Sequence, residues 1–278
     1  MKVAIFYPDS VTPKVVDAID RVSLLLEYYK YAYDMYNAYA SDKFFGRCMS
    51  NHDLAISIGG DGTILRVAKH VSNRGIPILG INAGRMGYLA DVKIEDVEEA
   101  IYMLLTSQYT IEDRSRLCLS IDGEEVGCEA LNDIVFKGQG FGMVSVNVNI
   151  NGLHDVVYRA DGLVVSTPSG STGYSVSAGG PVISPNCETI ALTPVAPHML
   201  NMRSIIIPSK DLSLTVSVET RREDYLVVVD GDPLIFTSEG CRKFTITNAK
   251  MPAKLIKLTG QNFYKTLTEK LLWGVNTI

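Results

Sequence analysis

The chain has 278 residues, 46% of them hydrophobic and 21% charged, which is typical of a globular protein large enough for two domains. Its 26 basic and 31 acidic residues give a net charge of −5, which argues against nucleic acid as the main partner. Five scattered cysteines without a C-x-x-C pair argue against a disulfide framework and a zinc site, and no apolar run approaches the ~20 residues that span a membrane.

The N-terminal segment begins with a predicted strand, Lys2–Tyr7, and shows no signal-peptide pattern, so we expect a cytoplasmic protein. Apolar residues at helical spacing then predict a helix over residues 15–29. Residues 28–39 contain six of the fourteen tyrosines. Because three of these tyrosines recur at steps of four and three, we expect the half-buried face of a helix there rather than an aromatic cage.

The stretch from Asp53 to Thr63 is the most informative part of the first half. An Ile-rich run predicts a buried parallel strand. Two glycines, an acid and a third glycine follow this strand, and a helical pattern continues from Ile64. Backbone N–H groups at such a turn can receive phosphate, while Asp61 can hold a phosphate-bound metal or accept a proton from a hydroxyl. An ordinary strand–helix turn with Asp61 as its cap is the alternative. The turn matches neither a Walker A loop nor a G-x-G-x-x-G fingerprint.

A second strand and glycine loop follow the first. Residues 76–82 predict another buried strand, residues 83–91 a glycine-punctuated loop, and residues 92–105 a helix. Alternating strands and helices predict an α/β domain with a parallel sheet over residues 1–113. Both glycine loops then lie at the carboxyl ends of strands, where ligands usually bind.

From about residue 114 the pattern changes to short β-type runs separated by turn residues, which predicts an all-β second domain over residues 114–258. Residues 262–273 form an amphipathic pattern, and we expect the tail, residues 259–278, to return as a helix to the first domain.

Two polar stretches of the second domain are candidate binding elements. Residues 158–181 carry a charged pair, a predicted strand and a dense run of hydroxyls and glycines around Tyr174. Such a run suits recognition of a sugar, an amide or a base, and a surface turn or a flexible linker is the alternative. Asn132 and Asp133 precede a strand and can bind a ribose diol or form an Asx turn.

Together these stretches resemble the NAD kinases of the bacterial type over nearly the whole chain. Four segments in order carry the resemblance: residues 59–63 (GGDGT), 80–89 (GINAGRMGYL), 132–133 (ND) and 159–181. The first segment alone also resembles diacylglycerol kinases, sphingosine kinases and 6-phosphofructokinases. The hydroxyl-rich segment is much more specific.

The resemblance implies transfer of a phosphoryl group from ATP to the 2′-hydroxyl of the NAD adenosine ribose, with Mg²⁺ carried by the ATP phosphates and no metal site made by the protein. It makes Asp61 the catalytic residue and gives the phosphate path to Gly59, Gly60, Gly62 and Thr63. The NAD-binding residues that it implies are Asp61, Gly62, Arg66, Tyr88, Asn132, Asp133, Arg159, Asp161, Thr172, Gly173, Tyr174, Ser175 and Ser177. Asp133 stands where the family often has Glu, so its carboxylate reaches less far.

Members of the family usually form homodimers or homotetramers whose sites are completed across a subunit contact, and residues 193–203 resemble the loop involved. A buried connection within a monomer is the alternative for these residues. A lipid or sugar kinase of the same superfamily remains an alternative, although no membrane-facing apolar or basic element is evident. A non-catalytic nucleotide sensor is a third possibility, against which the presence of Asp61 counts.

Overall fold

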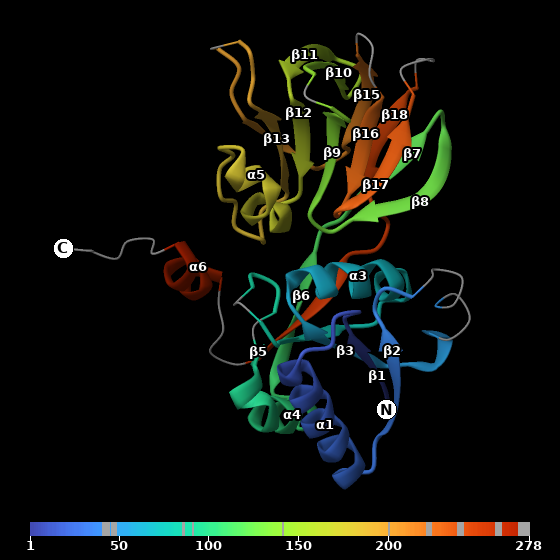
Figure 1. The fold of residues 1–278 in the computed structure, drawn as a ribbon, viewed down its shortest axis with the longest axis vertical. Helices are drawn as coiled ribbons and strands as arrows, with labels where there is room; N and C mark the ends of the chain where they lie inside the picture. Colours follow the sequence, from blue (N-terminus) through green and yellow to red (C-terminus); the bar gives the residue numbers. More distant parts are fainter. Residues whose placement is uncertain are drawn as a thin grey trace, which may run out of the picture. The chain divides into compact units, whose positions relative to one another are not determined.

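A computed structural model of the chain describes residues 1–40, 45, 49–84, 87–90, 92–140, 142–199, 201–220, 224–237, 242–258 and 263–271. It divides into two compact units, one formed by Met1–Arg114 with Met251–Ile278 and the other by Ser115–Lys250. The first unit combines helices with a mainly parallel sheet and the second is built from antiparallel strands (Figure 1), so the predicted α/β plus all-β fold class is confirmed. Within the described residues, no helix has the length and apolar character needed to cross a membrane.

The first unit is organised around one sheet. In spatial order its strands are β2 (Ala32–Asn37), β1 (Lys2–Tyr7), β3 (Leu54–Gly59), β4 (Ile78–Asn82), β19 (Ala253–Leu258) and β6 (Tyr109–Arg114), with β5 (Val92–Lys93) paired to β4. All neighbours are parallel except β19 and β6, which are antiparallel. The burial of β3 and β4 along their whole length explains their continuous apolar sequence.

Helices cover both faces of this sheet. Figure 1 shows α1 (Pro13–Tyr28) and α4 (Val97–Leu105) on one face and α3 (Asp61–Val71) on the other. On the α1 and α4 side, alternate apolar residues of the central strands form one buried cluster with these helices. On the α3 side, Gly80 of β4 has no room for a side chain, because a Cβ there would lie 2.5 Å from Ile64 Cδ1. This close approach fixes the start of α3 beside the carboxyl ends of β3 and β4.

The tyrosine-rich segment is a strand, so the helix predicted for it is wrong. Helix α1 ends at Tyr28, and Lys30 adopts a left-handed φ of 60° that ends the helical path. Residues 32–37 then form β2 and pair in parallel with β1. Tyrosine favours strands, and three tyrosines fell at helical spacing by coincidence. The helix predicted from residue 92 likewise begins later, because β5 and a 3₁₀ turn (Ile94–Asp96) precede α4.

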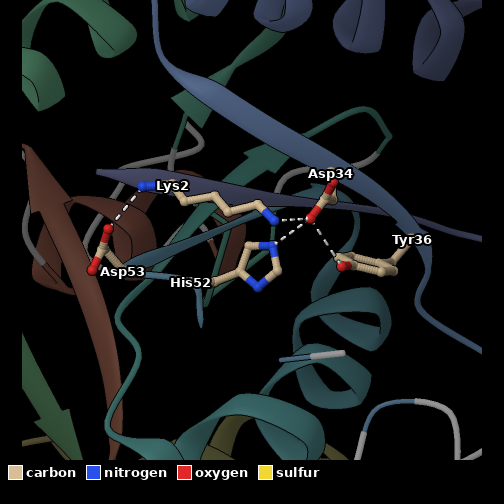
Figure 2. A network of polar contacts seen from close by, with 5 residues as sticks. All are labelled: Lys2, Asp34, Tyr36, His52 and Asp53. Atoms are coloured by element: carbon tan, nitrogen blue, oxygen red, sulfur yellow. Dashed lines mark hydrogen bonds and ion pairs between the residues drawn. The ribbon is translucent and has the colours of Figure 1, made fainter. Parts of the chain in front are cut away.

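Polar side chains tie the edge strand β2 to the rest of the sheet. As Figure 2 shows, the Asp34 carboxylate lies 2.6 Å from Lys2 Nζ and 3.0 Å from His52 Nε2, and the Tyr36 hydroxyl donates to it at 3.3 Å. The backbone N–H of Lys2 donates to Asp53 at 2.7 Å. The hydrogen bond from Lys2 lowers the pKa of Asp34, with a smaller contribution from His52, and partial burial opposes them. Asp34 therefore remains an ionised anchor for β2.

The second unit is a sandwich of two six-stranded sheets. The first sheet runs β11 (His154–Ala160), β10 (Val144–Ile150), β15 (Ser213–Glu219), β18 (Phe244–Asn248), β7 (Leu117–Ile121) and β8 (Glu124–Ala130). The second runs β14 (Ile205–Pro208), β13 (Thr189–Val195), β12 (Gly162–Ser166), β9 (Asp133–Gly138), β16 (Tyr225–Val229) and β17 (Asp232–Phe236). One buried apolar cluster takes residues from both sheets, including the rings of Phe136 and Phe244 with centroids 5.4 Å apart.

The C-terminal segment belongs to the first unit. Strand β19 lies within the range 114–258 predicted for the all-β domain, but it pairs with β4 and β6 of the first sheet. Helix α6 (Phe263–Leu271) follows, with Leu267 buried. Residues 262, 272 and 273 of the predicted tail helix lie outside the described residues.

Candidate active site

The predicted glycine turn joins β3 to α3 in the first unit. Gly60 is the N-cap of α3 and Asp61 its first residue. A Cβ at Gly59 would lie 2.3 Å from Thr63 Oγ1, so the Thr63 side chain is buried against the turn. Around Gly60, by contrast, a Cβ would have no atom of the described residues within 4 Å. The turn therefore presents backbone N–H groups at an open helix N-terminus, where the helix dipole favours a phosphate.

The Asp61 carboxylate is held by the second glycine loop. Its Oδ2 accepts the backbone N–H of Tyr88 at 2.7 Å, and its Oδ1 accepts those of Leu89 at 3.1 Å and Ala90 at 3.2 Å. Three N–H donors stabilise the ionised carboxylate and fix its orientation. Asp61 is thus more than a helix cap, because its partners are 27 to 29 residues away along the chain. Arg85, Met86 and Asp91 of this loop lie outside the described residues.

Lys270 lies close enough to Asp61 to interact with its charge, and Arg66 belongs to the helix that begins with Asp61. The Lys270 ammonium of α6 lies 4.0 Å from the centroid of the Tyr88 ring. Burial lowers the pKa of Lys270, against the charge of Asp61, and the pKa of Tyr88 is raised by burial and then by Asp61. Arg66 stacks over the Tyr39 ring at 5.1 Å. Lys270 was not predicted as a site residue, because a lysine on an amphipathic helix carries no signal that separates it from a solvent-facing one.

In the second unit, Asn132 and Asp133 are held by a carboxylate that the sequence did not single out. Asp230 accepts backbone N–H groups from Leu131 at 2.6 Å, Asn132 at 2.8 Å and Asp133 at 3.0 Å. Asp230 and Gly231, with φ of 47° and 89°, form the two-residue turn between β16 and β17. The Asp-Gly pair predicts that turn, but its contact with residues about 100 positions earlier has no local signal.

The hydroxyl-rich run is folded rather than a flexible linker. It forms a 3₁₀ turn (Ser169–Thr172) and the short helix α5 (Tyr174–Ser177). Thr167 Oγ1 donates to the Leu131 carbonyl at 2.6 Å and accepts the Gly170 N–H at 3.0 Å. A Cβ at Gly170 would lie 2.0 Å from the Asn132 carbonyl oxygen. The run therefore packs directly against the Asn132–Asp133 segment, and glycine is required for that approach.

The predicted NAD residues of this unit fall into two groups. The group around Asn132 and Asp133 includes Gly173, whose Cβ position lies 3.6 Å from Asn132 Nδ2 and 3.8 Å from Asp133 Oδ2. Tyr174 is 42% exposed, and Thr172 and Ser177 are at least partly exposed. Ser175 is fully buried and its hydroxyl is shared with Thr193 at 2.9 Å, so in this chain it supports the fold.

Arg159 and Asp161 form the second group, at the other end of β12. Ser166 of β12 pairs with Asp133, whereas Gly162 pairs with Lys137, so about 16 Å of strand separates Asp161 from Asp133. Both side chains are exposed, and Asp161 lies 3.9 Å from His198 Nε2. The structure does not bring this pair next to Asn132.

In the group around Asn132 and Asp133, the buried amide oxygen and the buried carboxyl are candidates for binding a ligand. Asn132 Oδ1 is buried, and none of the residues that the structure describes donates a hydrogen bond to it. Burial and the nearby Asp230 raise the pKa of Asp133 to about 7. Burial also raises the pKa of Asp230, while its three N–H donors and Arg116 oppose the shift, so near neutral pH we assign the proton to Asp133.

The pKa of Asp133 predicts a pH dependence of stability. An Asp is expected to titrate near 3.9 in the unfolded chain, so the folded state binds the extra proton between about pH 4 and pH 7. The contribution of Asp133 to stability is therefore full below about pH 4 and is lost as the pH rises through about 7. Relative to wild type, Asp133→Asn is expected to gain roughly 2–4 kcal/mol in free energy of unfolding from pH 4 to pH 8. Urea unfolding of both proteins at several pH values measures this difference, and a difference that stays constant with pH would contradict it.

No group of three or more His, Cys, Asp or Glu side chains is placed to hold a metal ion within the part of the chain that the structure describes. A parallel sheet ending in a phosphate-type glycine turn, with a fixed carboxylate at the helix start, is typical of proteins that act on phosphorylated ligands. Together with the buried amide and carboxylate of the β unit, these features are those of a nucleotide-dependent kinase.

Comparison with known proteins identifies the family. Residues 18–109 match the ATP-NAD kinase N-terminal domain and residues 131–258 match the ATP-NAD kinase C-terminal domain. An NAD kinase of Bacteroides fragilis is 44% identical over 243 residues, 85% of this chain and 82% of that protein. The chain belongs to the ATP-NAD kinase family, which confirms the resemblance seen in the sequence.

Two solved structures share the fold. The crystal structure of yeast NADH kinase complexed with NADH has a TM-score of 0.87 at 21% identity and covers 100% of this chain and 89% of its own. The structure of an NAD kinase from Archaeoglobus fulgidus in complex with ATP has a TM-score of 0.79 at 27% identity and covers 98% and 99%.

Proposed function

We propose that this chain is an NAD kinase that transfers the γ-phosphoryl group of ATP to the 2′-hydroxyl of the adenosine ribose of NAD. In this reaction the hydroxyl oxygen bonds to the γ-phosphorus, the bond to the bridging oxygen breaks, ADP leaves with the electron pair, and the hydroxyl proton is released. Membership of the ATP-NAD kinase family supports this activity. The observation that carries the mechanism is the Asp61 carboxylate, fixed by three N–H groups beside the open glycine turn.

In the first unit, Asp61 orients the hydroxyl and receives its proton, which is a role worth ~10²- to 10⁴-fold for a positioned base. Gly59, Gly60 and Gly62 give phosphate groups access to the helix N-terminus, and Thr63 supports the turn from its buried position. The ATP phosphates would hold Mg²⁺, which would supply neutralisation of the charge that develops on them. The donor set fits this assignment, because three of the four lone-pair positions of the Asp61 carboxylate already accept N–H groups, which leaves one for a substrate hydroxyl.

The second unit holds NAD. The unpartnered Asn132 Oδ1 accepts a hydrogen bond from the nucleoside, and Asp133 binds the ribose. A proton on Asp133 makes that side chain a donor as well as an acceptor, which suits a hydroxyl partner. Thr172, Gly173 and Ser177 line the pocket, and the exposed Tyr174 ring stacks on a base or nicotinamide ring.

We also propose that the enzyme is a cytoplasmic homodimer or homotetramer in which Asp161 meets a second copy. The N–H of Asp161 donates to the Val195 carbonyl at 3.0 Å, and the N–H of His198 donates to the Arg159 carbonyl at 3.0 Å. Asp161 therefore lies beside the stretch 193–203, for which the sequence implied a subunit contact; Leu200 of that stretch lies outside the described residues. This placement accounts for a functional Asp161 that is remote from Asp133.

The first test is NADP formation from NAD and MgATP, measured through a coupled NADP-specific dehydrogenase. We expect turnover of about 1–100 per second that requires both substrates. Diacylglycerol and fructose 6-phosphate, offered as acceptors, test the rival kinase activities, and polyphosphate and NADH test the donor and acceptor ranges. Light scattering on the same preparation gives the number of subunits. An enzyme that binds NAD but forms no NADP with any donor would be a nucleotide sensor instead.

A further inference from the structure

The backbone segment Gly87–Ala90 forms a cradle around the Asp61 carboxylate. The three N–H donors come from successive residues, Tyr88, Leu89 and Ala90, at 2.7, 3.1 and 3.2 Å. Leu89 is 5% exposed and Ala90 1% exposed, so two of the donors come from residues inside the protein. A buried backbone of this kind holds its acceptor in one orientation.

The cradle is itself anchored to the sheet. A Cβ at Gly80 of β4 would lie 3.0 Å from Ala90 Cα as well as 2.5 Å from Ile64 Cδ1. Gly80 therefore allows both Ala90 and helix α3 to pack close to β4. Because Asp61 begins α3 and Ala90 ends the cradle, the carboxylate and its donors are positioned by the same contact.

Gly87 brings the cradle within reach of Asp61. A Cβ at position 87 would lie 1.7 Å from Asp61 Oδ1, 2.4 Å from Cγ and 2.8 Å from Oδ2. No side chain fits in this space while the carboxylate keeps its position. Gly84, earlier in the same loop, differs, because the nearest atom to its Cβ would be Asn82 Oδ1 at 3.9 Å.

The two carboxylate oxygens are not equivalent in this arrangement. Oδ1 accepts two N–H groups and Oδ2 accepts one. A carboxylate oxygen has two lone-pair positions, so the contacts of the described residues occupy Oδ1 fully and leave one position on Oδ2. The oxygen with the remaining position is the one able to accept a hydrogen bond from a substrate hydroxyl.

We infer that Gly87 is a positioning residue of the kinase: it lets the 88–90 backbone hold Asp61 by Oδ1 and present Oδ2 to the acceptor hydroxyl. This inference rests on the proposed role of Asp61. It adds a residue that touches no substrate, and it assigns different tasks to the two oxygens. It also explains why a glycine is required at this position.

The decisive comparison is Gly87→Ala against Gly84→Ala in the full chain. Since a displacement of about 1 Å can lower a rate ~100-fold, we expect Gly87→Ala to lower kcat by roughly 10- to 100-fold, with the KM for NAD changed less than about threefold. Gly84→Ala is expected to keep kcat within about twofold, because the nearest described atom to its Cβ, Asn82 Oδ1, would be at an ordinary contact distance of 3.9 Å. Equal kcat values for the two variants would overturn the inference.

A second measurement needs no activity. Because overpacking destabilises a protein, Gly87→Ala is expected to lower the Tm by about 3–10 °C when Asp61 is present, and by less than about 2 °C in an Asp61→Ala background, where the colliding atoms are gone. Equal Tm losses in both backgrounds would overturn the contact. If wild type forms no NADP, the proposed function fails, and this cycle still decides whether Gly87 positions Asp61.

Discussion

Replacing Asp61 by Asn is expected to lower kcat for NADP formation by ~100-fold or more. The amide keeps the size of the carboxylate but carries no charge and cannot take up the hydroxyl proton. The amide nitrogen of Asn is itself a donor, so it cannot accept a hydrogen bond from the backbone N–H that it faces, because all three backbone groups at residues 88–90 are donors. Chemistry and orientation are both impaired by this one substitution.

Steady-state kinetics with NAD and MgATP, together with calorimetric titration of NAD, measure this loss. We expect NAD affinity to change less than about threefold, because the proposed contacts of NAD lie mostly in the second unit. Asp53→Asn is the matched control, since Asp53 is an exposed carboxylate of the same unit that accepts the Lys2 N–H at 2.7 Å and lies 3.8 Å from the N-terminal ammonium. Full activity of Asp61→Asn would remove Asp61 from the mechanism while leaving the enzyme assignment intact.

The part of the site that the sequence predicted well is local in the chain. The run from Leu54 to Val71 folds as a strand, a turn and a helix because a buried apolar run, two glycines and a helical repeat follow each other directly. Asp61 could be selected as a candidate functional residue because a carboxylate in a phosphate-type turn is chemically unusual. The four separated motifs then sufficed to indicate the family.

The contacts that the sequence could not reveal join distant residues. Asp230 meets the Asn132–Asp133 segment across about 100 positions, and Lys270 meets Tyr88 across about 180. Neither contact leaves a periodic pattern, because it depends on how the strands are ordered in the sheets. The same reason explains β19, whose sequence indicates a strand but not the sheet that it joins.

Hydroxyl groups carry a second ambiguity that composition does not resolve. The resemblance placed Thr172, Ser175 and Ser177 of the hydroxyl-rich run among the NAD-binding residues. In the structure Thr167, Ser171 and Ser175 bond to backbone or to another hydroxyl inside the protein. A buried hydroxyl needs a partner whether or not a ligand is present, so composition alone cannot separate the two uses.

The second large effect is expected at Asp230, for which Asp230→Gly is the most informative substitution. Glycine tolerates the left-handed backbone of this turn, where Asp230 has φ 47°, so the variant removes the carboxylate without straining the hairpin. The N–H groups of Leu131, Asn132 and Asp133 then lose their acceptor, and Leu131 and Asp133 are buried. Unsatisfied donors cost about 1–3 kcal/mol each and relief of the buried charge offsets part of this, so we expect a net loss of about 2–4 kcal/mol.

Function is expected to fall with stability, because the released segment carries both Asn132 and Asp133; NAD should bind ~10-fold more weakly or worse. Asp122→Gly is the matched control: Asp122 and Gly123 form the same kind of turn between β7 and β8, with φ of 52° and 87°, but that carboxylate is on the surface and pairs with Arg242. Urea unfolding and NAD titration of the two variants separate the effect of the carboxylate from that of the turn.

Since the charge of Asp230 raises the pKa of Asp133, the stability of Asp230→Gly should also depend less on pH between about 4 and 7 than that of wild type. If Asp230→Gly and Asp122→Gly were equally stable and bound NAD equally well, the Asp230 carboxylate would not hold this half of the site.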